Sequence, residues 1–175
     1  IADHRRFYPP DIRSEYLPTV SLPTPEMNPP WSGEKKLLAS ELAEASTPSD
    51  LQELLQPLVD GYKRWADENF EPATQAHHAH LLELATAAHD RMGCGLDLLL
   101  RDRDARLAFN LANQAIATSN QWKNEGRPLI WYKFQIAFAL SVLSSVTERS
   151  SPEREALDLL WVATGGGKTE AYLLV

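Results

Sequence analysis

The chain has 175 residues, 43% of them hydrophobic and 23% charged, which suits a soluble globular domain, and no apolar run approaches the ~18 residues that a membrane span requires. The formal net charge is −7, and the sequence has no basic patch of the kind that marks a nucleic-acid-binding surface, so any contact of this segment with DNA or RNA is expected to be small or to depend on other parts of the protein. The single cysteine excludes an internal disulfide and agrees with a reducing, cytoplasmic location.

Residues 1–33 contain most of the prolines and are expected to form an extended arm. The chain opens with Ile1 rather than Met and lacks the basic and apolar regions of a secretion signal, so this start is not expected to be the native N-terminus. Proline fixes φ and removes an N–H donor, which excludes a helix or an inner strand here. Aromatic residues between the prolines favour an arm that wraps over another part of the protein: Phe7, Tyr8, Tyr16 and Trp31.

Residues 34–146 carry a hydrophobic pattern that predicts a helical accessory domain. The first clear helix start is Thr47-Pro48-Ser49-Asp50, with Thr47 as N-cap, proline at the first helical position and an acid in the first turn. Pro57 lies inside the same helix and is expected to kink it or to mark a later start. One buried face is predicted from residues that follow the helical repeat: Leu51, Leu54, Leu55, Leu58, Val59, Tyr62, Trp65 and Ala66.

Three further helices are predicted in this domain. One covers residues 72–92 and is expected to weaken or break at Gly93-Cys94-Gly95. The next begins near Asp102 and ends by Gly126. It carries four apolar residues on one side: Leu107, Leu111, Ala115 and Ile116. The last covers residues 131 to about 146 and is nearly all apolar, so it should be buried on most sides.

The character of the sequence changes after residue 146. Residues 147–155 are polar and predict a loop. Residues 157–163 form a short apolar run, bounded by turn signals, that is typical of a buried parallel strand. Three glycines follow directly, and then residues that can start a helix. A strand, a glycine loop and a helix in this order are the context that a phosphate-binding loop requires.

The glycine loop reads Ala163-Thr164-Gly165-Gly166-Gly167-Lys168-Thr169-Glu170. Its glycines let the backbone bring N–H groups to the oxygens of a nucleoside triphosphate without a Cβ in the way. Lys168 would reach the β- and γ-phosphates, and the Thr169 hydroxyl would ligate Mg²⁺. The sequence therefore predicts ATP and Mg²⁺ as cofactors, with Lys168 and Thr169 as catalytic residues. The predicted nucleotide contacts in the loop are Thr164, Gly165, Gly166, Gly167, Lys168, Thr169 and Glu170.

Alternatives stay open at this loop. The strict phosphate-loop pattern has glycine where this chain has Val162, although the variant with three glycines is similar to that of helicases of the second superfamily. The structural alternative is a glycine-rich turn that only leaves a strand, but three glycines before Lys-Thr are uncommon by chance. For Glu170 the alternative role is an acid near a helix N-terminus, where it would add stability of ~0.5 kcal/mol.

Gln135 is the other predicted nucleotide contact. It is the only amide inside an otherwise apolar segment upstream of the loop. In helicases of this superfamily a glutamine ahead of the loop reads the adenine edge, because its amide offers both a donor and an acceptor. Burying an amide without partners is costly, so Gln135 requires either adenine or a backbone or water partner. The residues themselves leave both possibilities open.

The histidines do not predict a metal site. His77, His78, His80 and His89 fall in one predicted helix, and no cysteine or acidic cluster joins them. The spacing of His77 and His80 is not the i, i+4 pair of a zinc-binding helix.

Two segments carry a family resemblance: Phe-Gln-Ile-Ala-Phe at 134–138, and Asp-Leu-Leu-Trp-Val-Ala-Thr-Gly-Gly-Gly-Lys-Thr-Glu-Ala-Tyr-Leu at 158–173. They resemble the large helicase subunit of the DISARM anti-phage defence systems, the DrmA-type proteins. Residues 105–115 and the helix that contains Leu58 and Trp65 are similar to the helical region before the motor core of those proteins. Family members often have Trp-Arg-Pro-Phe-Gln where this chain has Trp-Tyr-Lys-Phe-Gln, so the glutamine matches but the Arg-Pro pair does not.

The resemblance implies an ATP-dependent DNA helicase or translocase that works with a second subunit to restrict phage DNA. The expected fold is mainly α: an arm over residues 1–33, a helical accessory domain over 34–146, and over 147–175 the incomplete start of a RecA-like α/β lobe. A complete motor needs further acidic residues and an arginine finger, so the chain is expected to be a fragment without ATPase activity of its own. The alternative is a helical interaction module that docks a partner subunit or gates the DNA channel without catalysis.

Overall fold

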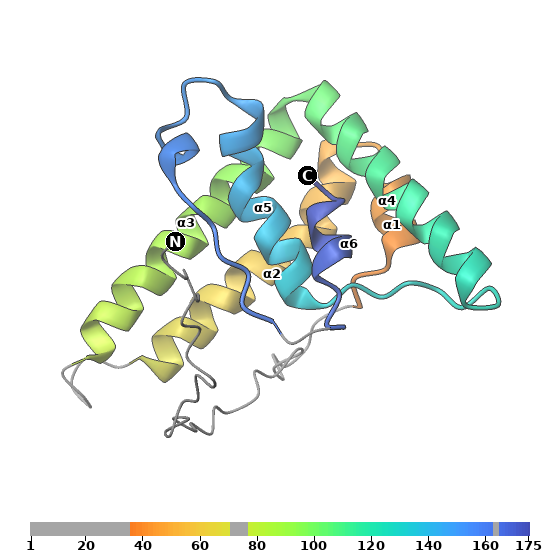
Figure 1. Ribbon diagram of the computed structural model, residues 1–175. Helices are drawn as coiled ribbons and strands as arrows, with labels where there is room; N and C mark the ends of the chain where they lie inside the picture. The colour runs from red at the N-terminus through yellow and green to blue at the C-terminus, as the bar shows by residue number, and fades with distance from the viewer. Residues whose placement is uncertain (1–35, 71–76, 163–164) are drawn as a thin grey trace, which may run out of the picture.

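The computed structural model describes residues 36–70, 77–162 and 165–175, and these residues are mainly α-helical (Figure 1), as the sequence predicts. The predicted arm over residues 1–33 lies outside the described residues. The elements in chain order are α1 (Ala39–Glu44), α2 (Pro48–Asn69), α3 (His78–Arg101), α4 (Arg103–Lys123), α5 (Lys133–Thr147), the 3₁₀ turn η1 (Pro152–Glu155) and α6 (Lys168–Tyr172). No helix in the described ranges is long and apolar enough to cross a membrane.

Helix α2 begins as its sequence predicts. The Thr47 hydroxyl accepts a hydrogen bond from the Asp50 N–H, and the Asp50 carboxylate accepts one from the Thr47 N–H, which completes a capping box. Pro48 occupies the first turn, where its missing N–H has no cost. The helix continues across Pro57, so the expectation of a later start is wrong. Buried apolar residues on both sides of Pro57 hold the helix against its neighbours: Leu51, Leu55, Leu58 and Val59.

Helix α3 runs without interruption through residues 93–95, so the predicted break is also wrong. Gly95 is buried where α3 crosses α5, and a Cβ at this position would lie 1.9 Å from the Leu140 carbonyl oxygen. The glycine therefore permits a close approach of two backbones, which offsets its weak helix propensity. Gly93 meets nothing within 4 Å and has no comparable role.

Helix α4 has its predicted start, and three of the four residues on its predicted apolar side are exposed. Asp102 is the N-cap, and its carboxylate accepts hydrogen bonds from the Asp104 and Ala105 N–H groups. Leu107 and Leu111, expected on one apolar side, are more than half exposed. The buried residues of this helix are Phe109, Asn110, Asn113 and Ala117.

Two buried amides explain why α4 turns this face inward. The Asn110 side chain donates hydrogen bonds to the Leu42 and Ala45 carbonyls of the α1 region, at 2.5 and 3.1 Å. The side-chain oxygen of Asn113 accepts a hydrogen bond of 2.9 Å from the buried Trp131 indole N–H. Satisfied amides can be buried at little cost, so hydrophobic periodicity alone misjudges such a face.

Helix α5 lies at the centre of the molecule and packs against α3 and α6 (Figure 1). Its predicted burial is confirmed, since Ile136, Ala139 and Leu140 are completely buried. The preceding chain is fixed to the α1 region by an isolated antiparallel bridge between Leu38 and Ile130. The core that results is continuous through all the longer helices.

The predicted strand is not formed in the described residues 157–162, and Ala163 lies outside them. Leu157, Leu159 and Trp161 are 96%, 80% and 70% exposed. A parallel strand requires a neighbouring strand to bond with, and the described residues contain no strand. The segment therefore runs along the helical body as irregular chain before it reaches the glycine loop.

Candidate functional site

The glycine loop turns sharply at two glycines. Gly165 and Gly167 both have φ of +82°, a left-handed conformation that residues with a Cβ rarely adopt. Gly167 is the N-cap of α6, which begins at Lys168 as the sequence predicts. A Cβ on Gly167 would also lie 2.5 Å from the Gln135 Nε2 atom, whereas one on Gly165 would meet nothing within 4 Å. Gly167 is thus required both for its backbone angle and for the close approach of Gln135.

Gln135 joins α5 to the glycine loop. The side chain is only 4% exposed. Its Nε2 donates a hydrogen bond of 2.8 Å to the Gly167 carbonyl, and its Oε1 accepts one of 2.8 Å from the Tyr132 N–H. The amide therefore has backbone partners, as expected if Gln135 has a structural role. Because an amide carries two N–H groups and two lone pairs, one donor and one acceptor position remain beyond these two bonds.

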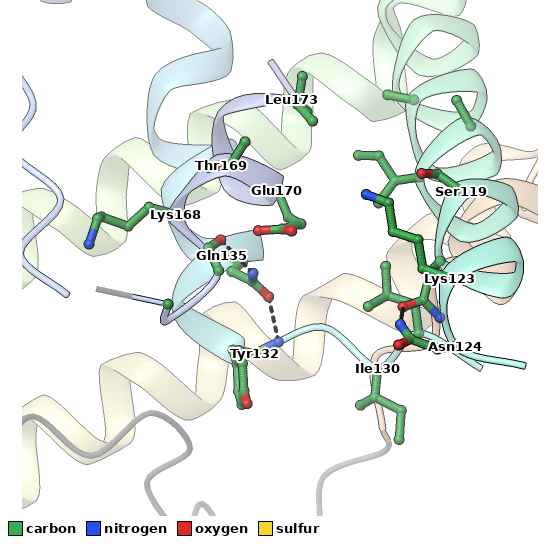
Figure 2. A pocket seen from close by; sticks show the side chains of 17 residues that line it. Ser119, Lys123, Asn124, Ile130, Tyr132, Gln135, Lys168, Thr169, Glu170 and Leu173 are labelled. Carbon is green, nitrogen blue, oxygen red and sulfur yellow. Dashed lines mark hydrogen bonds between the residues drawn. The ribbon is translucent and has the colours of Figure 1, made fainter. Parts of the chain in front are cut away.

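The side chain of Lys168 is directed to the segment before the loop. Its Nζ donates a hydrogen bond of 2.6 Å to the carbonyl of Val162, the residue that replaces the first glycine of the strict pattern. In Figure 2 Lys168 points away from Glu170, while the Glu170 carboxylate lies close to Gln135. Thr164, also predicted to bind the nucleotide, lies outside the described residues.

A cavity of about 830 Å³ opens beside the loop. Gly165, Gly167, Lys168, Thr169 and Glu170 line it on one side, and residues of α4 line it on the other (Figure 2). Gln135 and Tyr132 also contribute to its surface. The structure therefore brings together Gln135 and five of the seven loop residues that the sequence predicts, and it adds α4, which the sequence did not predict.

Arg91 on α3 fixes the segment that leads into the loop, and sequence reasoning missed it. Its Nη1 and Nη2 atoms donate hydrogen bonds of 2.7 and 2.8 Å to the two carboxylate oxygens of Asp158. Its Nε lies 3.3 Å from the Glu153 carboxylate. The hydrogen bonds from Arg91 lower the pKa of the Asp158 carboxyl, and the same pair raises the pKa of Arg91. The two residues are far apart in the chain, and no local pattern indicates that they meet.

The described residues contain no group of three or more His, Cys, Asp or Glu side chains that could hold a metal ion. Two of the histidines lie beside acids instead: His80 Nδ1 is 3.8 Å from Glu83, and His89 Nδ1 is 3.0 Å from Asp90.

The sequence of the chain is similar to that of a curated protein. The chain is 29% identical over 151 residues to the DISARM protein DrmA of Bacillus paralicheniformis. The match covers 76% of this chain but 14% of that protein, so the chain spans a small part of its relative's length. The chain is therefore similar to DrmA at modest identity, and the resemblance read from its sequence is confirmed. No protein-family model matches the chain. No solved structure matches it.

Proposed function

We propose that this chain is the ATP-binding part of a DNA helicase or translocase that couples ATP hydrolysis to movement on DNA, in bacterial anti-phage defence. One observation carries the proposal: the buried Gln135 amide bonds to the carbonyl of Gly167, in a loop of left-handed glycines followed directly by Lys168 and Thr169. The relationship to the DISARM protein DrmA supports the defence role.

The residues of the loop fit a triphosphate with Mg²⁺. Gly165 has open space where a side chain would stand, which leaves its backbone accessible to phosphate oxygens. ATP supplies the phosphoryl group that is transferred to water, and Mg²⁺ supplies positive charge to its oxygens. Lys168, which now bonds to the Val162 carbonyl, would bond to phosphate oxygens, and the Thr169 hydroxyl would supply a ligand to Mg²⁺. Gln135 holds the loop and offers its remaining donor and acceptor to adenine.

The exposed segment before the loop supports the further proposal of a RecA-like lobe. Leu157, Leu159 and Trp161 alternate with other residues along an irregular stretch and stand largely in solvent. In the full-length protein we propose that residues 157–163 form a parallel strand with neighbours supplied by other parts of the chain, which would bury these side chains. Movement on DNA and the remaining catalytic groups would also depend on those other parts.

The test is ATP hydrolysis by the full-length protein with Lys168→Ala. Loss of the cation that bonds to the terminal phosphates should lower turnover by roughly two orders of magnitude or more. Lys63→Ala removes a lysine of α2, a helix that contributes no residue to the cavity lining, and serves as the matched control, with turnover unchanged. A Lys168→Ala protein that hydrolyses ATP at nearly the wild-type rate would overturn the assignment.

A second candidate function, docking of a partner subunit, is favoured by one feature of α4. Leu107 and Leu111 lie one turn apart on this helix and are 52% and 53% exposed. Neighbouring exposed apolar residues of this kind can contribute to a protein-binding surface. In the full-length protein, Leu107→Asp with Leu111→Asp should weaken co-purification of the second defence subunit and leave ATP hydrolysis unchanged. Co-purification equal to that of the wild type would exclude this surface.

A further inference from the structure

One face of α4 forms the wall of the cavity opposite the glycine loop. The lining residues recur at the spacing of a single helical face along the second half of the helix: Ala112, Ala115, Ile116, Ser119, Asn120 and Lys123. This face is distinct from the buried one, which carries Phe109, Asn110 and Asn113. It belongs to the helical domain, whereas the loop belongs to the segment that follows it. Residues from two parts of the chain therefore enclose one cavity.

The residues of α4 that line the cavity change from apolar to polar along the helix. Ala112, Ala115 and Ile116 are small or apolar, and Leu173 of the segment after α6 also lines the cavity. Towards the end of α4 the lining becomes polar with Asn120 and Lys123. Ligand cavities of about 300–1,000 Å³ with apolar walls and a few polar groups are typical of sites for molecules the size of a nucleotide.

The charges in the cavity indicate which end of a nucleotide it suits. Glu170 lines it, and Figure 2 shows Lys123 extending from α4 into the same space. A carboxylate opposes the negative charge of a triphosphate, but it can accept hydrogen bonds from the hydroxyl groups of ribose. Lys168 also contributes to the lining, but its Nζ donates a hydrogen bond to the Val162 carbonyl. Because Lys123 and Glu170 bring opposite charges to this space, the region between them suits a neutral, partly apolar group, with the phosphates held by the backbone of the loop.

We propose that the base and ribose of the nucleotide lie in the cavity between α4 and α6, so that α4 of the helical domain forms one wall of the nucleotide site. This inference rests on the proposed function, because it assumes that the loop holds the phosphates. It assigns Ala115 and Ser119 to the base-and-ribose region. The helical domain is then part of the nucleotide site rather than a separate attachment to it.

The experiment places a bulky side chain in the cavity of the full-length protein and measures the binding of two ligands. Ala115 is an exposed residue on the cavity wall, so Ala115→Trp adds bulk there without disturbing the core. Ala108→Trp is the matched control: Ala108 is also exposed, lies two turns earlier on the same helix, and does not line the cavity. The ligands are a non-hydrolysable ATP analogue and inorganic tripolyphosphate, both with Mg²⁺, measured by calorimetry. Tripolyphosphate has no base or ribose and needs only the loop.

Ala115→Trp should weaken binding of the ATP analogue by at least roughly tenfold and leave tripolyphosphate binding unchanged. Ala108→Trp should change neither. Unchanged binding of the ATP analogue by Ala115→Trp overturns the inference but leaves the proposed function standing. If Lys168→Ala affects neither ligand, the proposed function itself fails. If Ala115→Trp loses tripolyphosphate binding as well, Ser119→Leu, a smaller change on the same face, replaces it and is judged by the same outcomes.

Discussion

At the scale of single residues, the contact between Gly167 and Gln135 joins two requirements. Gly167 holds a left-handed φ, and its missing Cβ leaves room for an amide that is bonded on both sides. Gln135 in turn is buried, so it cannot move aside without losing those bonds. Each residue therefore limits what can stand at the other position.

We expect Gly167→Ala to weaken ATP binding through both the backbone angle and the clash. The left-handed conformation costs a residue with a Cβ about 1 kcal/mol, and the methyl group would displace Gln135 Nε2, which lies 2.5 Å from its position. In a Gln135→Ala background the clash disappears and only the backbone cost remains. A double-mutant cycle on ATP affinity should therefore show a smaller effect of Gly167→Ala when Gln135 is absent. Strictly additive effects would mean that the contact does not contribute to ATP binding.

Gln135→Ala should relax base selectivity more than it lowers affinity for the triphosphate. The proposed adenine contact uses the donor and acceptor that remain on the amide, and a site built to bond one base edge discriminates through groups left unpaired by the wrong base. The measurement is the ratio of ATP to GTP turnover in the full-length wild type and variant. An unchanged ratio, with lower turnover of both nucleotides, would identify Gln135 as a positioning residue of the loop only.

At the scale of elements, Arg91 connects α3 to the chain between η1 and the glycine loop. The bidentate pair with Asp158 is about three-quarters buried, since the side chains are 23% and 27% exposed. A guanidinium group that donates two hydrogen bonds to one carboxylate fixes the relative orientation of the two side chains and also stabilises the fold. The pair sets where residues 157–162 run along the helical body, and hence where the loop begins.

Arg91→Met should lower the free energy of unfolding by about 1 kcal/mol at neutral pH. The pKa of Asp158 is lowered in the folded state, so the stability from its ionised form is present above the usual carboxyl pKa of about 3.9 and is lost as the pH falls through the lowered value. The difference in the free energy of unfolding between wild type and variant should therefore become smaller at acidic pH. Denaturant unfolding at several pH values measures this difference. Arg101→Met is the control, because its pair with Glu148 is more exposed and should contribute little. A difference that stays constant down to pH 3 would contradict the role of Asp158.

The elements also show where sequence reasoning succeeds and fails. The start of α2 was predictable because Thr47, Pro48 and Asp50 satisfy the helix end through neighbours in the chain. The continuity of α3 was not, because the need for Gly95 comes from the Leu140 backbone of another helix. In the candidate site the loop and Gln135 could be found from local patterns. Arg91 and the α4 wall could not, since each acts on a residue distant in the sequence.

At the scale of the whole molecule, the described helices form one core while the segment before the loop remains at its surface. Residues of α1 to α5 and Leu174 contribute to the same buried cluster. Residues 157–162 expose most of their large apolar side chains instead. Stability is therefore expected to be distributed unevenly, with the lowest protection next to the glycine loop.

Hydrogen exchange on the 175-residue chain should separate these regions. Residues 104–116 in α4 and 131–143 in and before α5 should be strongly protected, because their helical hydrogen bonds adjoin completely buried side chains such as Asn113, Ile136 and Leu140. Residues 157–175 should exchange quickly, because the stretch before the loop is irregular and α6 has only five residues.

ATP hydrolysis by the same chain should be undetectable, since phosphoryl transfer also needs an oriented water and a charge-stabilising arginine, which we expect other parts of the protein to supply. Uniform protection through Val175 together with measurable turnover would instead mean that these residues already form a working ATPase.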